Sequence, residues 1–184
     1  MSLQYLRDLH TILSSCIDPF LRLIVTAVNN CSLVRRFAAK HVLPQMIDRG
    51  EGYLVNTSSA AGLLTQLGAA GYSVTKAAAV SFAEWVKITY GEKGIGVSCL
   101  CPQAVRTAMT AQGPGVAGVD GMMEPDVVAK EVLKCITEEK FLVLPHTEVA
   151  EYVSRKGNDR DRWITGMQRL QKQYEDFLTP VDMK

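Results

Sequence analysis

The chain has 184 residues, of which 47% are hydrophobic and 21% charged, and its formal net charge is +1. This length favours one domain with a buried core, and the absence of a basic patch argues against a nucleic-acid partner. The five cysteines are odd in number and irregular in spacing, which argues against a disulfide framework, and the three histidines lack ligand-like spacing. We therefore expect free thiols and no metal site.

Residues 1–31 form an atypical N-terminal segment with a weak helical pattern and no Gly-rich turn. Its apolar stretch is interrupted by Asp18, Pro19 and Arg22, which makes it a poor membrane span. The segment also lacks the basic region that opens a signal peptide. We therefore expect a cytoplasmic protein without a membrane span.

From residue 32 onward, helical and strand-like patterns alternate. Apolar residues recur at helical spacing in three stretches, at residues 32–48, 73–93 and 124–136. Short β-rich runs bounded by turn residues predict three strands, at residues 53–57, 95–100 and 141–144. Pro44 lies late in the first helix and is expected to end or kink it.

This alternation predicts an α/β fold with a parallel sheet and helices on its faces. Loops rich in small residues are expected at 58–71 and 107–123. The tail at 147–184 is charged and amphipathic, and it predicts a helical segment that ends near Leu178. The chain thus divides into 1–31, 32–146 and 147–184.

Three residues carry the chemical signal. Tyr72 and Lys76 are four positions apart, so they share one face of a helix, and Ser59 directly follows a predicted strand. Because ligands of α/β sheets bind at the carboxyl ends of the strands, a serine there and a helical Tyr/Lys pair can meet in one crevice. A phenol near an ammonium can exchange a proton with an alcohol or carbonyl oxygen, and a serine hydroxyl can hold that oxygen.

A lone Tyr-x-x-x-Lys pair arises often by chance, and such a pair is usually a solvated helix face. The surrounding text is more specific: Val55-Asn56-Thr57-Ser58-Ser59-Ala60-Ala61-Gly62, then Tyr72-Ser73-Val74-Thr75-Lys76-Ala77-Ala78, then Cys101-Pro102-Gln103-Ala104-Val105-Arg106-Thr107. These segments, in this order and at these spacings, resemble the short-chain dehydrogenase/reductase family. The resemblance implies a Rossmann-like parallel sheet with flanking helices, here truncated at its N-terminal side.

The resemblance also implies roles for single residues. Ser59, rather than Ser58, matches the catalytic serine because of its spacing to Tyr72, which matches the general acid/base. Lys76 matches the lysine that supports this tyrosine and holds the nicotinamide ribose. A turn that cups the nicotinamide is matched by Pro102, Val105 and Thr107.

The cofactor implied is NAD or NADP, and the substrate is a small alcohol or carbonyl compound. The loop at 108–123 matches the substrate-binding region, and its apolar residues favour an apolar substrate. In the family, the helices matching 32–48 and 73–93 usually form the contacts of a homo-oligomer.

The sequence departs from the family at three points. The Gly-rich turn that takes the pyrophosphate is absent, which makes tight cofactor binding by this chain hard to explain, and the residue that reads the adenosine ribose and so chooses between NAD and NADP is absent as well. The catalytic asparagine matches Asn29 only with a small insertion, and a helix N-cap is an equal alternative for Asn29. Gln103 stands where the family usually has glycine.

Three hypotheses follow. The first is an NAD(P)-dependent oxidoreductase acting between an alcohol and a ketone or aldehyde. The second is a truncated, catalytically silent product that acts as an interaction module with full-length relatives, and the third is a chain that does not fold stably. The strand at 53–57 would lie at an open sheet edge in such a product, which invites pairing with another chain.

Overall fold

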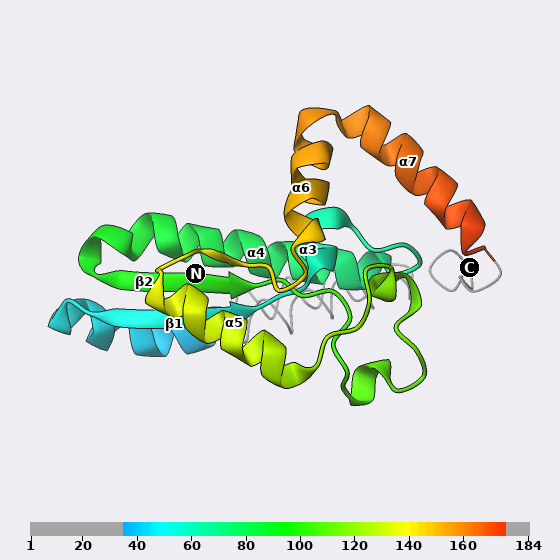
Figure 1. Ribbon diagram of the computed structural model, residues 1–184. Coiled ribbons are helices and arrows are strands. Elements are labelled where there is room, and N and C mark those ends of the chain that lie inside the picture. Colours follow the sequence, from blue (N-terminus) through cyan, green and yellow to red (C-terminus); the bar gives the residue numbers. More distant parts are fainter. Residues whose placement is uncertain (1–34, 176–184) are drawn as a thin grey trace, which may run out of the picture.

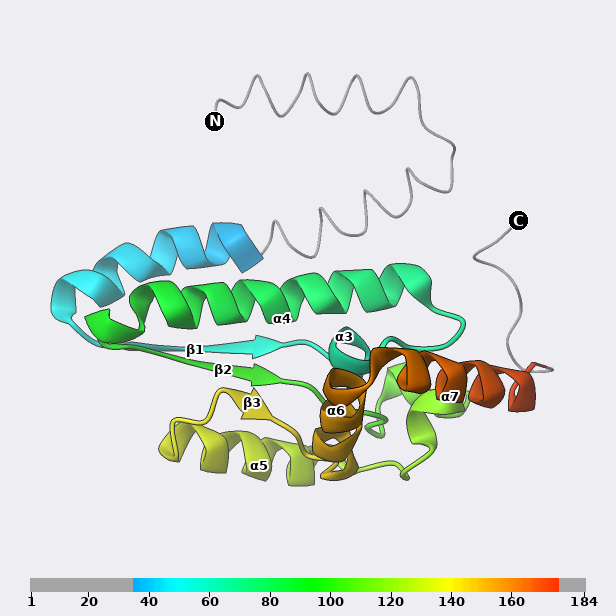
Figure 2. The same cartoon turned by 90° about the horizontal axis from the view of Figure 1, so that it is seen from above.

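The computed structural model describes residues 35–175. Three parallel strands form one sheet in the order β1 (Gly52–Thr57), β2 (Ile95–Leu100), β3 (Leu142–Val143); Figure 1 shows β1 and β2, and Figure 2 shows all three. Strands β1 and β2 pair along their whole length, in a register that runs from Gly52↔Ile95 to Thr57↔Leu100. The expected α/β fold with a parallel sheet and flanking helices is confirmed.

Helices cover both faces of this sheet (Figure 2). The helix at 35–49 and α4 (Ala70–Tyr90) lie on one face, and α5 (Pro125–Thr137) lies on the other. The central strand β2 is therefore covered on both sides, which explains its nearly continuous apolar sequence. The main core cluster consists of Ala39, Leu43, Val80, Ala83, Val86, Ile95, Val97, Cys99 and Cys101.

The helix at 35–49 continues through the exposed Pro44, so of the two effects expected at this proline the helix end is wrong, and the kink stays a prediction. Its end is set by Gly50, which adopts a left-handed conformation with φ of 74°. The Gly50 amide donates to the Ile47 carbonyl, and the Glu51 amide donates to the Met46 carbonyl, each at 3.1 Å. These two bonds satisfy the last carbonyls of the helix and turn the chain into β1.

The stretch 58–71, expected to be a loop, contains the short helix α3 (Ala60–Leu64). Ser59 is its N-cap, and the Ser59 hydroxyl accepts a hydrogen bond from the Ala61 amide at 3.2 Å. Five residues are too few for a periodic pattern to reveal a helix. The expected helix at 73–93 is confirmed as α4 and the 3-10 helix η1 (Gly91–Lys93).

The loop at 107–123 contains two 3-10 helices, η2 (Ala108–Thr110) and η3 (Gly115–Gly118). The expected helical tail is confirmed as far as Gln173, but as two helices, α6 (Glu148–Asn158) and α7 (Arg160–Gln173), and residues 176–184 lie outside the described residues. Val149 of α6 packs with Ala60 and Leu64 of α3, which docks the tail on the carboxyl end of the sheet.

No helix within residues 35–175 combines the length and the apolar composition that a bilayer span requires. The N-terminal segment 1–31, including Asn29, lies outside the described residues.

Candidate active site

Ser59 lies just beyond the carboxyl end of β1. The hydrogen bonds between β1 and β2 continue past the strands, because the Ser58 amide donates to Leu100 O at 2.7 Å and the Ala60 amide donates to Pro102 O at 2.9 Å. The Ser59 side chain is mostly buried and also lies 3.4 Å from Pro102 O. The residues before and after Ser59 are therefore both hydrogen-bonded to β2 or its continuation.

The two neighbouring serines have different surroundings. The Ser58 hydroxyl donates to Lys76 O at 2.8 Å, so it joins the serine loop to α4. Ser59 instead lines a pocket, and Ser58 does not. Of the two, Ser59 is the one whose hydroxyl can meet a bound molecule.

Tyr72 and Lys76 lie near the beginning of α4, one helical turn apart. The Lys76 ammonium is 5.3 Å from the centre of the Tyr72 ring, and 36% of Tyr72 is exposed. Within residues 35–175, neither the Tyr72 hydroxyl nor the Lys76 ammonium has a hydrogen-bond partner. Both groups are thus available to a ligand.

The contact between α3 and α4 brings the serine loop to these two residues. Gly62 of α3 lies so close to α4 that a Cβ at this position would be 2.6 Å from the carbonyl carbon and oxygen of Lys76. Only a glycine permits this approach, and the Ser58 hydrogen bond lies beside it. The elements that carry Ser59, Tyr72 and Lys76 therefore lie against each other, and the meeting of the three side chains in one crevice stays a prediction.

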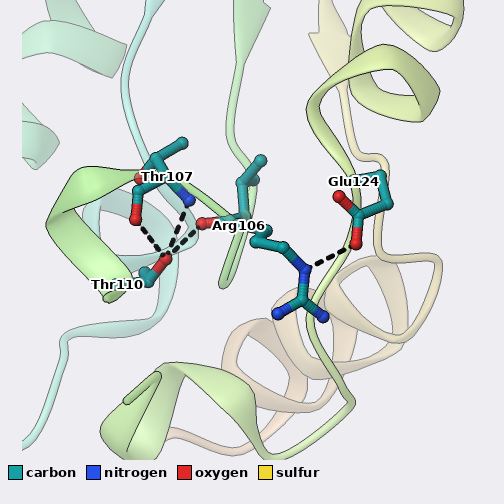
Figure 3. Close-up of polar contacts among 5 residues, drawn as sticks. Arg106, Thr107, Thr110 and Glu124 are labelled. Atoms are coloured by element: carbon teal, nitrogen blue, oxygen red, sulfur yellow. Dashed lines mark hydrogen bonds and ion pairs between the residues drawn. The ribbon is translucent and has the colours of Figure 1, made fainter. Parts of the chain in front are cut away.

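Pro102, Val105 and Thr107 follow β2, and the turn that they belong to is held by Thr110 (Figure 3). The Thr110 hydroxyl accepts from the Thr107 amide at 3.0 Å and lies 2.7 Å from Val105 O. Thr107 itself is exposed. The backbone of the turn is thus fixed while Thr107 faces the solvent.

The same turn closes the base of the loop at 107–123, which we call the substrate loop after the role that the sequence resemblance implies for residues 108–123. The Arg106 amide donates to Met123 O at 2.8 Å, and the Met123 amide donates to Ala104 O at 3.0 Å. Outside this short ladder, Arg106 Nε lies 2.5 Å from Glu124 Oε1, as Figure 3 shows. The two ends of the substrate loop are therefore held side by side.

A pocket of about 340 Å³ opens beside Ser59, between α3, the substrate loop, α6 and α7. Tyr72 and Lys76 do not line it. Its apolar lining consists of Ala60, Ala61, Leu64, Leu67, Val116, Ala117, Val119, Trp163, Gly166, Met167 and Leu170. Its polar lining consists of Ser59, Thr65, Gln66, Gln103, Tyr152 and Arg155. This volume and mostly apolar wall are typical of a small-molecule site.

One wall of the pocket contains a hydrogen-bonded group centred on Asp120. Gln103 Nε2 donates to Asp120 Oδ2, and the Tyr152 hydroxyl donates to Asp120 Oδ1, each at 2.9 Å. Burial and the neighbouring Asp120 raise the pKa of Tyr152, which keeps this hydroxyl a donor. Two elements from distant parts of the sequence thus meet at one carboxylate.

His146 contacts one member of this group, Gln103. Its side chain is 2% exposed, and Nδ1 accepts a hydrogen bond from the Gln103 backbone amide at 3.2 Å. Burial lowers the pKa of His146, so the imidazole is neutral near pH 7 and Nδ1 can accept. No pattern in the sequence pairs His146 with Gln103, because 43 positions separate them.

Cys99 and Cys101 lie side by side in the core with their sulfur atoms 3.8 Å apart. The contact with Cys101 and burial both raise the pKa of the Cys99 thiol. Both residues are free thiols and fully buried, as the sequence predicted. In the described part of the chain, no three histidine, cysteine or acidic side chains are grouped to hold a metal ion.

The sequence missed Tyr152 and Trp163 as parts of the pocket, and Asp120 as the hydrogen-bond partner of Tyr152. Asp120 lies in a loop without periodicity, and the other two residues lie on amphipathic helices, where the pattern favours a docking role. The one signal in the sequence was Gln103 in place of the family's glycine. It pointed to this position but did not identify the residues that contact Gln103.

Comparison with known proteins identifies the family. Residues 23–114, half of the chain, match the short chain dehydrogenase family. Oxidoreductase UcpA of Escherichia coli K12 is 32% identical over 132 residues, which cover 71% of this chain and 48% of that protein. The chain therefore spans about half the length of the curated relatives it matches.

Two solved structures share the fold. A short chain dehydrogenase from Burkholderia cenocepacia in complex with NADP has a TM-score of 0.66 at 17% identity, and the match covers 91% of this chain and 63% of that one. A short chain dehydrogenase/reductase from Burkholderia phymatum in complex with NAD has a TM-score of 0.55 at 24% identity, covering 67% and 53%. The sequence match and the shared fold together show that the chain belongs to the short-chain dehydrogenase/reductase family of oxidoreductases.

Proposed function

We propose that the chain is an NAD(P)-dependent oxidoreductase that transfers a hydride between an alcohol and a ketone or aldehyde. The observation that carries this proposal is the contact of Gly62 and Ser58 with the backbone of Lys76. This contact fixes the serine loop against the helix that presents Tyr72 and Lys76. Ser59, in the same loop, lines a pocket that can hold a substrate.

Each of the three side chains has a distinct task in this proposal. The Tyr72 phenol gives a proton to the carbonyl oxygen in reduction, or takes it from the alcohol in oxidation. The Lys76 ammonium, 5.3 Å from the Tyr72 ring, stabilises negative charge that develops on the phenolic oxygen. The Ser59 hydroxyl donates a hydrogen bond to the substrate oxygen and orients it.

The residues present fit a nicotinamide ring and its ribose. The bound dinucleotide supplies or accepts the hydride, which no side chain can do. Tyr72 and Lys76 offer a free hydroxyl and a free ammonium to ribose hydroxyls, while Val105 and the exposed Thr107 lie at the turn suited to the carboxamide. Because relatives with this fold were solved with NAD and with NADP, we propose either dinucleotide as the cofactor.

We propose an apolar substrate, on the basis of the pocket. Leu64, Leu67, Met167 and Leu170 lie along its wall, and Ser59 contributes a polar group at one end. Burying a hydrocarbon body against these side chains would provide most of the binding free energy. The carbonyl or alcohol group would then face Ser59.

The test is a titration of the purified chain with NADH and NADPH, followed by turnover with an apolar ketone. We expect saturable binding, with a dissociation constant on the order of micromolar. We expect Tyr72→Phe to lower turnover by roughly 10²- to 10⁴-fold while cofactor binding persists.

Tyr90→Phe is the matched control, because it removes a hydroxyl from the same helix at a residue that packs against Trp85. It should leave turnover unchanged. Undiminished turnover in Tyr72→Phe would rule out the assigned role of this tyrosine.

A second candidate is a catalytically silent interaction module. It is favoured by apolar side chains exposed on the helix at 35–49 and on α4, with Phe37 48%, Trp85 51% and Ile88 81% exposed. Absence of dinucleotide binding by a folded chain, together with co-elution with a full-length relative in size-exclusion chromatography, would favour this candidate over the enzyme.

A further inference from the structure

We propose that Asp120 is a positioning residue, whose carboxylate joins Gln103 and Tyr152 and so holds the substrate loop closed as a wall of the pocket. The inference rests on the proposed function for one point only, namely that the substrate uses this pocket.

The geometry gives Asp120 two separate partners. Its Oδ2 accepts from Gln103 Nε2 and its Oδ1 accepts from the Tyr152 hydroxyl, so each carboxylate oxygen is bound by a different element. Gln103 lies in the turn after β2, and Tyr152 lies on α6. Hydrogen bonds to a charged acceptor are stronger than neutral ones, so this pair of contacts is able to fix a loop.

The other hydrogen bonds of the substrate loop show which part of the loop depends on Asp120. The base of the loop is closed by the ladder at Arg106 and Met123. Farther along the loop, the Ala104 amide donates to Ala117 O at 3.1 Å, three residues before Asp120. Ala117 is thus held by Ala104, whereas Val119, which also lines the pocket, lies between Ala117 and Asp120. Release of Asp120 would therefore free the part of the wall that contains Val119.

Gln103 is suited to this task in a way that glycine is not. A glycine has no side chain to donate to Asp120, whereas the Gln103 side-chain amide reaches the carboxylate and also lines the pocket. The Gln103 backbone is itself held by His146, which accepts from its N–H group. Residue 103, at which the sequence departs from the family, thus carries the side chain that donates a hydrogen bond to Asp120.

Reversal of donor and acceptor provides the test. Gln103→Glu keeps the shape of the side chain but places a carboxylate opposite Asp120, and the two like charges repel. In the double variant Gln103→Glu with Asp120→Asn, the new amide at position 120 donates to the carboxylate introduced at position 103, and its carbonyl still accepts from Tyr152. The matched control is Gln168→Glu, the same change at an exposed position of α7 outside the pocket.

The first measurement is amide hydrogen exchange of residues 115–121. We expect Gln103→Glu to raise the exchange rates about tenfold, in line with the loss of a hydrogen bond to a charged group. We expect the double variant and the Gln168→Glu control to exchange like the natural chain. If Gln103→Glu is too unstable to study, Tyr152→Phe removes a single donor without adding charge and should raise exchange in the same residues.

Unchanged exchange in Gln103→Glu, or failure of the double variant to restore protection, would overturn the proposal. In a chain that turns over an apolar ketone, Gln103→Glu should raise KM while kcat changes little, because the loop contributes to binding rather than to proton transfer. If the natural chain shows no turnover, the proposed function fails, whereas the exchange experiment still decides the role of Asp120.

Discussion

A β-carbon on Gly62 would lie 2.6 Å from the carbonyl carbon and oxygen of Lys76. The backbones of α3 and α4 thus meet where the Ser59 loop and the Tyr72 helix must be held in fixed relation. At the scale of single residues, the geometry of the candidate site therefore depends on the absence of a side chain as much as on the side chains that are present.

Gly62→Ala should destabilise the chain by about 1–3 kcal/mol, because the added methyl overlaps backbone atoms that cannot rotate away. Urea unfolding followed by circular dichroism measures the change in free energy. Gly157→Ala is the control, since its new Cβ would meet no atom within 4 Å, and alanine is the better helix former by roughly 1 kcal/mol. Equal effects of the two variants would contradict this account of Gly62.

His146 makes stability depend on pH. Its folded-state pKa is lowered by burial from the ordinary value of 6.5, whereas Glu148 and Asp120 act in the opposite direction with smaller effect. The unfolded chain therefore binds the proton more tightly, so the stabilisation is fully present above about pH 6.5 and decreases as the pH falls below that value.

His146→Asn keeps an acceptor for the Gln103 backbone amide and removes the titration. We expect unfolding free energies of the natural chain to drop between about pH 7.5 and pH 5.5, and this part of the drop to vanish in His146→Asn. His41→Asn, the same change at an exposed position, is the matched control. A profile that His146→Asn does not alter would show that His146 is not responsible.

The sequence predicted residue neighbours only where spacing encodes them. Tyr72 and Lys76 could be paired because positions four apart share a helix face. Asp120 and Tyr152 could not be paired, because 32 positions and a change from loop to helix separate them. Long-range polar contacts of this kind leave no periodic trace in one sequence.

At the scale of elements, the tail is built from two helices joined at Asp159. This residue adopts an extended backbone with φ of −147° and ψ of 96°, and its carboxylate accepts from the Arg162 amide at 2.9 Å. It therefore ends α6 and caps α7. Because Trp163 and Met167 of α7 line the pocket, the cap also sets the direction of that wall.

Asp159→Ala should weaken α7 by about 1 kcal/mol through loss of the N-cap, with faster hydrogen exchange confined to its first two turns. Asp161→Ala is the control, because Asp161 contributes only its charge in the first turn of the helix. Exchange that rises equally in both variants would mean that the cap does not hold this helix.

The ends of helices and strands were predictable where a glycine or proline marks them. Strand β2 begins after Gly94 and ends before Pro102, and its observed bounds, Ile95–Leu100, match the expected ones. Helix α3 was missed because it is one turn long, and the end expected at Pro44 was wrong because two capping bonds beyond it set the helix end. Local capping hydrogen bonds decided both cases, and the spacing of apolar residues does not reveal such bonds.

At the scale of the whole molecule, the described sheet has β1 at one edge and β3 at the other. The carbonyl of Thr57 at the end of β1 accepts from Arg35 Nη2 at 2.9 Å. The helix at 35–49 and α4 expose apolar side chains, among them Phe37, Trp85 and Ile88, which are suited to association. We propose that a second copy of the chain binds there.

Ile88→Glu should shift this association toward monomers, because it places a charge in the apolar contact. Sedimentation velocity over a range of concentrations measures the change. Thr89→Glu, at the next exposed position of α4, is the matched control and should alter association less. If the natural chain sediments as a monomer throughout, a contact between copies at this surface is excluded.

The two tryptophans of the chain lie in different surroundings. Trp85 is 51% exposed on α4, between Phe82 and Tyr90, whereas Trp163 lines the pocket next to Tyr152. The protein thus carries two intrinsic optical reporters, one on its outer helical surface and one in its interior site. With Trp85 replaced by phenylalanine, emission reports on the pocket alone, and with Trp163 replaced it reports on the surface alone.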